Sequence, residues 1–253
     1  MEKPNIETGV GSMIRMVADQ VLAGAGLALL RGPAGIGKTF ALDKIETEIE
    51  ASGGNVVRVT VSPANGGSIS AFIRAVLSQY RIETNSTSDS VDALFDLLSG
   101  YPFRSYGPRV IFMVDEAQEL KPAVLETIRS LWDRGTNARL GLSTGPAFGC
   151  MLVGNDLFMG KGGNILVAGF RPLLTRVTHN IALPRPSQAE HAAFASFLFP
   201  DAPELQGIVA GFGVDAGNLR AQDVAARQSR LFAGDSPVTP GHLRQAIKMM
   251  GGK

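Results

Sequence analysis

The sequence is poor in cysteine, and its charges nearly cancel. Cys150 is the single cysteine among 253 residues, so an internal disulfide is excluded, and its apolar neighbours at 151–153 predict a buried thiol rather than a nucleophile. Lys and Arg number 24 against 23 Asp and Glu. This balance excludes a strongly basic surface overall, although it allows a local basic patch.

The chain also lacks long apolar runs, repeats and low-complexity tracts. No run reaches the about 18 apolar residues that a membrane span requires, and the opening residues MEKPNIETG lack the apolar stretch of a signal peptide. We therefore expect a cytoplasmic protein without membrane contact. Its length suffices for one large domain, or for a domain and a smaller one.

The strongest motif is a glycine-rich loop that follows the apolar run LALL. Residues 32–39 read GPAGIGKT, which fits the phosphate-loop pattern G-x-x-x-x-G-K-[ST]. The glycines let backbone N–H groups approach phosphate oxygens, and the helix expected from Lys38 adds its positive dipole end. We expect Lys38 to reach the β- and γ-phosphates of ATP and Thr39 to bind Mg²⁺; the alternative is a turn that only joins a strand to a helix. The expected nucleotide contacts are Gly32, Pro33, Ala34, Gly35, Ile36, Gly37, Lys38, Thr39 and Phe40.

A second motif is the apolar run IFMV, which ends in Asp115 and Glu116. A carboxylate at the end of a buried parallel strand lies at the edge of the sheet where ligands bind. Asp115 is expected to hold Mg²⁺, through water, and Glu116 to orient and deprotonate the water that attacks the γ-phosphate. Asn155 follows the apolar run MLVG and is expected to contact the γ-phosphate or that water. The alternatives are a pair of solvated acids and a turn asparagine.

Apolar segments alternate with amphipathic segments, which predicts an α/β fold with a parallel sheet and right-handed crossovers. The helix 69–80 is expected to start at the N-cap Ser68, and the helix 87–99 at Ser88. Residues 135–149 are expected to form an extended loop, and the pattern after Pro184 is helical only. The expected strands are 27–31, 55–61, 109–115, 150–154 and 177–183, and the other expected helices are 10–23, 38–51, 122–134, a turn at 170–175, 187–199, 203–212, 218–232 and 239–250.

Five segments together resemble the AAA+ ATPases: GPAGIGKT, IFMVDEAQ, the asparagine of VGN, RPLLTR and GNLR at 217–220. Within that family the chain is most similar to the transposition ATPases of the phage Mu B, TnsC and TniB type, over about residues 10–250. The resemblance implies a P-loop NTPase with a five-stranded sheet of order 5-1-4-3-2. It also implies a nucleotide-binding core over 1–183, with a loose start at 1–9, and a helical lid over 184–253.

The resemblance assigns roles to single residues. Lys38 and Thr39 match Walker A, Asp115 and Glu116 match Walker B, Asn155 matches sensor 1, and Arg220 matches sensor 2. Arg176 is similar to the arginine finger that reaches the nucleotide of a neighbouring subunit, and Arg171 is the reserve candidate; both also read as a solvated basic edge. A finger from a neighbour makes the active site composite, so we expect a homo-oligomer, either a helical filament or a ring.

The function that the resemblance implies is ATP-dependent binding to duplex DNA without sequence preference. The oligomer delivers target DNA to a DDE-type transposase or activates it, as in the transposition and integration of a phage or mobile element. The alternatives are a nucleotide-gated DNA-coating protein whose hydrolysis only times disassembly, a helicase loader and a secretion-associated ATPase. The expected DNA contacts, each of which also reads as an ordinary exposed residue, are Ser62, Asn65, Ser68, Arg104, Lys121, Arg129, Arg134 and Arg139.

Overall fold

The computed structural model describes residues 6–100, 110–136, 146–155 and 171–252. The described residues divide into two compact units. The larger unit comprises Ile14–Arg31 and Thr39–Ala182, and the smaller one comprises the described residues of Met1–Met13, Gly32–Lys38 and Leu183–Lys253. The proposed division into a core over 1–183 and a lid over 184–253 stays a prediction. In the described ranges, no helix is long and apolar enough to cross a membrane.

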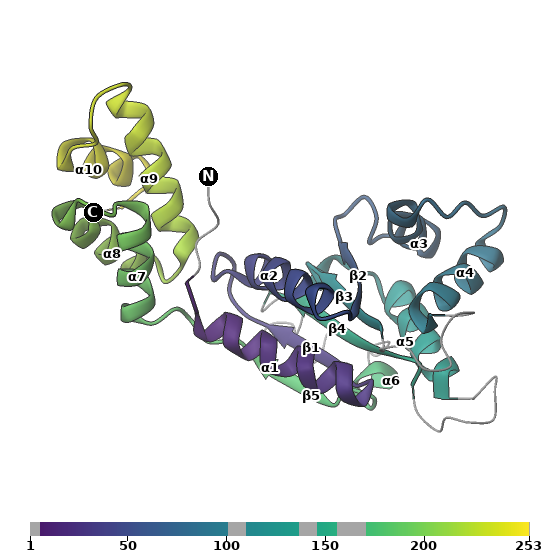
Figure 1. Ribbon diagram of the computed structural model, residues 1–253. Coiled ribbons are helices and arrows are strands. Elements are labelled where there is room, and N and C mark those ends of the chain that lie inside the picture. Colours follow the sequence, from purple (N-terminus) through teal and green to yellow (C-terminus); the bar gives the residue numbers. More distant parts are fainter. Residues whose placement is uncertain (1–5, 101–109, 137–145, 156–170, 253) are drawn as a thin grey trace. The chain divides into compact units, whose positions relative to one another are not determined.

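The larger unit is built on a five-stranded parallel sheet (Figure 1). The sheet order β2-β3-β4-β1-β5 is the predicted 5-1-4-3-2 order, so the α/β fold prediction is confirmed. Every residue of β3 and β4 is buried, which is expected of central parallel strands that are covered on both faces. The strands are β1 (Leu27–Arg31), β2 (Asn55–Thr60), β3 (Val110–Asp115), β4 (Phe148–Gly154) and β5 (His179–Ala182).

One face of the sheet packs against α3 (Ile69–Leu77), α4 (Thr87–Ser99) and α5 (Pro122–Thr136). Phe112 of β3 lies at the centre of this core, with the ring of Phe72 at 6.3 Å and that of Phe148 at 6.5 Å, both edge-on. Such aromatic pairs stabilise a core by about 0.5–1.5 kcal/mol beyond the area they bury.

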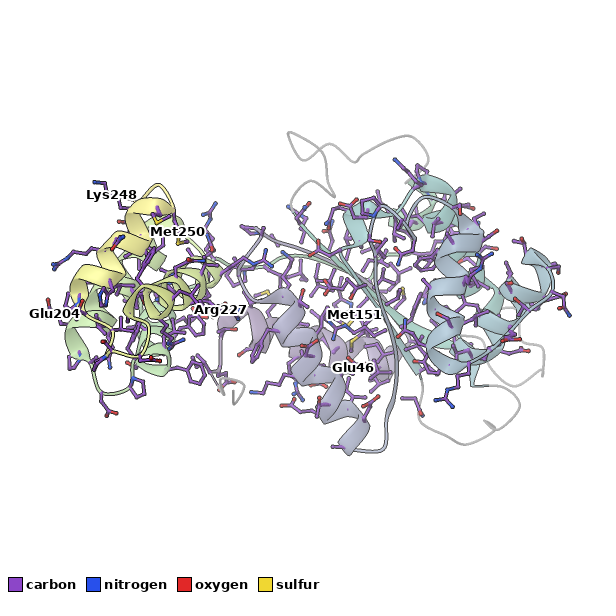
Figure 2. All side chains as sticks on the ribbon, turned by 90° about the horizontal axis from the view of Figure 1, so that it is seen from above. Glu46, Met151, Glu204, Arg227, Lys248 and Met250 are labelled. Carbon is purple, nitrogen blue, oxygen red and sulfur yellow. The ribbon has the colours of Figure 1, made fainter. Side chains whose placement is uncertain are left out.

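The opposite face is formed by the alternate residues of each strand. Figure 1 shows α1 (Gly9–Gly24) and α2 (Lys38–Ala51) on this side of the strands. Met151 of β4, labelled in Figure 2, is fully buried there.

The predicted loop 135–149 is wrong at its carboxyl end, because β4 already begins at Phe148, which pairs with Val110. Gly149 was read as a loop residue, but its role is close packing. A Cβ at Gly149 would lie 2.7 Å from the carbonyl oxygen of Val21 in α1, so only glycine lets the strand and the helix approach this closely.

The helix starts follow local capping chemistry. Ser68 caps α3 as predicted, and its hydroxyl accepts a hydrogen bond from the N–H of Ala71. The prediction of Ser88 as the cap of α4 is wrong. Ser86 has the extended backbone of an N-cap and accepts from the N–H of Asp89 at 3.1 Å, which places Ser88 inside the first turn.

Four helices lie wholly within the described residues of the smaller unit: α7 (Gln188–Leu198), α8 (Pro203–Ala216), α9 (Leu219–Ala233) and α10 (Pro240–Met249). Ser187 and Glu190 form the predicted capping box of α7. Helix α8 continues past the predicted end at residue 212. Gly213 lies inside this helix and lets α9 pack closely, since a Cβ there would lie 2.4 Å from the side chain of Gln222. The helix ends instead at Gly217, which has the left-handed backbone of a C-cap.

Candidate nucleotide-binding site

The phosphate loop follows the last residue of β1; its residues Gly32–Lys38 belong to the smaller unit, and Thr39 belongs to the larger one. Gly35 and Gly37 have φ angles of +80° and +97°, which require glycine. Lys38 is only 7% exposed, and its Nζ donates to the carbonyl oxygens of Gly32 and Pro33, both at 2.8 Å. The loop therefore gathers a buried ammonium group and the start of α2, which is what a polyphosphate site needs.

Helix α9 contacts this loop within the smaller unit. The carbonyl oxygen of Gly35 accepts hydrogen bonds from the backbone N–H groups of Leu219 at 3.1 Å and Arg220 at 3.2 Å. Asn218, the N-cap of α9, lies against the same glycine, and a Cβ at Gly35 would be 2.9 Å from its Oδ1. The GNLR motif therefore contacts the phosphate loop. The backbone of Arg220 is bonded to Gly35 of this loop, and its side chain is exposed.

At the carboxyl edge of the sheet, the predicted acidic and amide residues come together in the larger unit. Asp115 is fully buried, and its Oδ1 accepts a hydrogen bond from the N–H of Glu116 at 2.9 Å. The side-chain amide of Gln118 donates to Glu116 Oε2 at 2.5 Å and accepts from the N–H of Asn155 at 3.0 Å. The sequence reasoning gave Gln118 no role; its place in DEAQ, next to the acidic pair, was the available signal.

Arg58 of β2 is a second residue that sequence reasoning missed. Its guanidinium donates to Asp43 at 2.5 Å and Glu46 at 3.0 Å, and it lies 3.5 Å from both Asp115 Oδ2 and the carbonyl oxygen of Thr39. Burial lowers the pKa of Arg58, but the hydrogen bonds to Asp43 and Glu46 outweigh it, so the pKa lies above its ordinary value. Arg58 is the one charged residue in the strand NVVRVT, which is the signal that could have pointed to it.

The donor set fits Mg²⁺ bound together with a nucleotide. Thr39 supplies a hydroxyl and Asp115 a carboxylate, both within the larger unit. Among the described residues there is no cluster of three or more His, Cys, Asp or Glu that could hold a metal alone. Mg²⁺ in nucleotide sites takes most of its ligands from phosphate oxygens and water, so one or two protein groups suffice.

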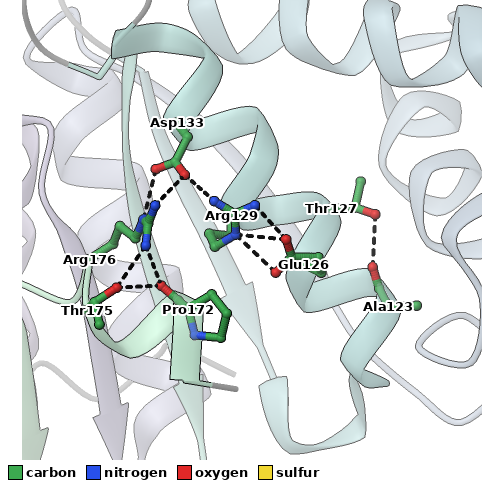
Figure 3. A network of polar contacts seen from close by, with 8 residues as sticks. All are labelled: Ala123, Glu126, Thr127, Arg129, Asp133, Pro172, Thr175 and Arg176. Atoms are coloured by element: carbon green, nitrogen blue, oxygen red, sulfur yellow. Dashed lines mark hydrogen bonds and ion pairs between the residues drawn. The ribbon is translucent and has the colours of Figure 1, made fainter. Parts of the chain in front are cut away.

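The candidate arginine finger lies in a polar network on the larger unit (Figure 3). Arg176 follows the short helix α6 (Arg171–Leu174); its Nη2 is 3.0 Å from Asp133 Oδ2, and its Nη1 donates to the carbonyl oxygen of Pro172 at 3.1 Å. Arg129 bridges Asp133 and Glu126, and its hydrogen bond lowers the pKa of the Glu126 carboxyl. Arg171 begins α6, and its side chain lies outside the described part of the chain.

The expected DNA contacts fall into two groups. Residues 62–68 pack on the turn after β3, since the N–H of Lys121 donates to the carbonyl oxygen of Gly66 at 3.0 Å, and Lys121 is exposed. Within this loop, Asn65 Oδ1 accepts from the N–H of Ser62 at 2.7 Å.

The second group lies on α5 and is paired with acids. Arg129 is held as described above, and Arg134 bonds Asp92 at 2.6 Å and stacks over the ring of Phe95. Arg104 and Arg139 lie outside the described residues.

A parallel sheet of this order, a phosphate loop after β1 and an acidic pair after β3 define a P-loop NTPase. The family model described as AAA domain matches residues 21–148, and the chain belongs to this family. It is accordingly an ATP-hydrolysing AAA+ ATPase. No curated protein is similar to the chain in sequence.

Solved structures show the same fold at low sequence identity. The Aeropyrum pernix ORC2 protein, in ADPNP and ADP complexes, has a TM-score of 0.66 and 18% identity, with 98% of this chain and 70% of that chain covered. Cdc6p from Pyrobaculum aerophilum has a TM-score of 0.63 and 15% identity, with coverages of 94% and 65%. A point mutant of Thermotoga maritima RuvB has a TM-score of 0.54 and 15% identity, with coverages of 96% and 68%.

Proposed function

We propose that this AAA+ ATPase oligomerises on duplex DNA in an ATP-dependent way and delivers target DNA to, or activates, a DDE-type transposase. The observation that carries the proposal is the partly exposed position of Arg176 three residues before β5, with about a third of its side chain accessible. The guanidinium group of Arg176 is always charged and partly exposed, so it could contact the phosphates of a nucleotide that is bound by a neighbouring copy of the chain.

Within one subunit, each site residue has a proposed task in hydrolysis. Lys38 and the loop amides bind the phosphates, and Thr39 and Asp115 hold Mg²⁺, which neutralises charge on the phosphate oxygens. Glu116 accepts a proton from water as the water oxygen bonds the γ-phosphorus and the bond to the β–γ bridging oxygen breaks. Asn155 senses the γ-phosphate, and Arg220 contacts the nucleotide from α9. The ADPNP and ADP complexes of the similar ORC2 structure support nucleotide binding by this fold.

The DNA-binding surface that we propose is the loop 62–68 together with Lys121. This loop is polar and glycine-rich, and it packs beside a lysine whose side chain is exposed. Small polar groups and a point charge suit contacts to the phosphate backbone, which carry no sequence preference. Arg129 and Arg134 are weaker candidates, because their guanidinium groups are bonded to carboxylates.

The first experiment measures ATP hydrolysis with and without duplex DNA of mixed sequence, and images the protein on that DNA with a non-hydrolysable ATP analogue. We expect DNA to stimulate turnover, and filaments or rings to form on it. Lys121→Ala should reduce the slope of log affinity against log salt concentration by about one, because one phosphate contact is lost. The matched substitution Lys248→Ala, at another exposed lysine, should leave this slope unchanged. If the protein neither binds duplex DNA nor hydrolyses ATP faster in its presence, the proposal is excluded, and a helicase loader or a secretion-associated ATPase is favoured.

A second measurement tests the transposition part by itself. Strand transfer by a DDE-type transposase into target DNA is followed with the protein and ATP, with the protein alone, and with Lys38→Ala. We expect stimulation only when ATP and an intact phosphate loop are present. DNA-stimulated turnover without any effect on strand transfer would leave a DNA-dependent ATPase and refute the transposase role.

A further inference from the structure

The side-chain amide of Gln118 connects the ends of two neighbouring strands. Strands β3 and β4 pair as far as Val114 and Leu152. Beyond this last pair, Gln118 Nε2 donates to Glu116 Oε2 at 2.5 Å, and Gln118 Oε1 accepts from the backbone N–H of Asn155 at 3.0 Å. The amide therefore joins the proposed catalytic base to the proposed sensor at the point where the backbone ladder stops.

The two bonds fix which way the amide faces. A flipped amide would point its carbonyl oxygen at the Glu116 carboxylate and its N–H₂ group at the Asn155 N–H, and both contacts would be repulsive. Gly154 provides the space for this arrangement, since a Cβ there would lie 2.9 Å from Gln118 Oε1. The close approach of the turn to β4 thus depends on glycine at the last position of the strand.

The turn that carries Glu116 is itself held in an unusual conformation. Glu116 has φ 54° and ψ 39°, a left-handed backbone that costs a residue with a side chain about 1–2 kcal/mol. Its carbonyl oxygen accepts from the N–H of Glu119 at 3.0 Å, and its own N–H donates to Asp115. Strained backbone that is held by several contacts is typical of functional sites, because it fixes where a side chain starts.

We propose that Gln118 is a positioning residue, which aims the carboxylate of Glu116 at the attacking water and couples this aim to the position of Asn155. The proposal rests on the proposed role of Glu116 as the base. A hydrogen bond to a carboxylate is charge-assisted and therefore directional. A general base must lie within hydrogen-bonding distance of the proton that it removes. A shift of the Asn155 backbone would therefore move the Gln118 amide, and with it the Glu116 carboxylate, relative to the attacking water.

The test compares Gln118→Ala with Gln79→Ala. Gln79 is an exposed glutamine of η1 (Ser78–Tyr80), and its amide donates to the carbonyl oxygen of Ala75 in α3 at 3.0 Å. Steady-state ATP turnover and the affinity for a fluorescent ATP analogue are measured with and without duplex DNA. We expect Gln118→Ala to lower kcat by about 10- to 100-fold, the range for a misplaced catalytic group, with analogue affinity unchanged. An unchanged kcat, or an equal loss of affinity, would overturn the positioning role.

A double-mutant comparison separates positioning from a general structural effect. In a Glu116→Gln background the base is gone, so Gln118→Ala should cause no further loss of kcat. A loss of the same size in both backgrounds would mean that Gln118 only supports the fold. Gln118→Glu is the second variant: it keeps an acceptor for the Asn155 N–H but puts a carboxylate against Glu116, and it should lower kcat at least as much as alanine.

The outcomes also separate this proposal from the base assignment. If Glu116→Gln abolishes turnover while Gln118→Ala leaves it unchanged, the base stands and the positioning role fails. If Glu116→Gln leaves turnover unchanged, the base assignment fails and the positioning role falls with it.

Discussion

Replacing Gly35 by alanine is expected to separate the phosphate loop from helix α9. At φ +80°, alanine costs about 1–2 kcal/mol more than glycine. The new Cβ would also lie 2.9 Å from Asn218 Oδ1, the atom that caps α9 by accepting from the N–H of Ala221. Displacing that cap costs about 1 kcal/mol more. We therefore expect the free energy of unfolding of the smaller unit to fall by about 2–3 kcal/mol.

Gly37→Ala is the matched control for this prediction. Gly37 has φ +97° but no heavy atom within 4 Å of an added Cβ, so its replacement introduces backbone strain without displacing the cap. Urea unfolding followed by circular dichroism gives the free energies, and hydrogen exchange reports on the first turn of α9. We expect exchange in that turn to be about fivefold faster in Gly35→Ala only, since about 1 kcal/mol of capping is lost. Equal unfolding losses in the two variants, with equal exchange in α9, would refute the reasoning.

Three further predictions concern the larger unit. Burial raises the pKa of the Cys150 thiol from 9.0 to about 12, so the folded protein should react slowly with thiol reagents. The free energy of unfolding, measured by urea titration, should fall by about 1.4 kcal/mol per pH unit between pH 9.0 and 12, because the thiol loses its proton first in the unfolded chain. Rapid labelling of the native protein would contradict this prediction. Asp133→Asn should lower the protein concentration for half-maximal ATP turnover by up to about fivefold, because a partly exposed pair with Arg176 is worth at most about 1 kcal/mol; slower turnover would mean that Asp133 assists the arginine. Arg58→Met removes the positive charge beside buried Asp115, so the free energy of unfolding should fall by about 2–3 kcal/mol in urea titrations followed by tryptophan fluorescence. Arg58→Lys keeps the charge but not the planar guanidinium, so it should restore only part of this loss. An unchanged unfolding midpoint in Arg58→Met would refute the stabilising role of Arg58.

The phosphate loop, the buried strands and most helix starts could be predicted from the sequence because their causes are local. Gly35 and Gly37 mark backbone that only glycine adopts, and continuous apolar runs mark strands that are covered on both faces. The same local logic failed where one residue type serves two purposes. Gly149 was assigned to a loop, and the helix expected at 203–212 ended just before Gly213, although each glycine makes room for a neighbouring element.

The contacts that tune the site were decided by the tertiary structure. Gln118 meets Asn155 across 37 residues, Arg176 meets Asp133 across 43, and Arg58 lies beside Asp115 across 57. No spacing rule links such pairs, because they depend on which strands become neighbours and on the direction in which each side chain leaves the sheet. The sequence by itself predicted a phosphate loop after one apolar strand and an acidic pair after another, because each of these motifs is written in consecutive residues. Only the tertiary structure placed the Gln118 amide between Glu116 and Asn155, and Asp133 beside Arg176, because these contacts join segments that are distant in the sequence.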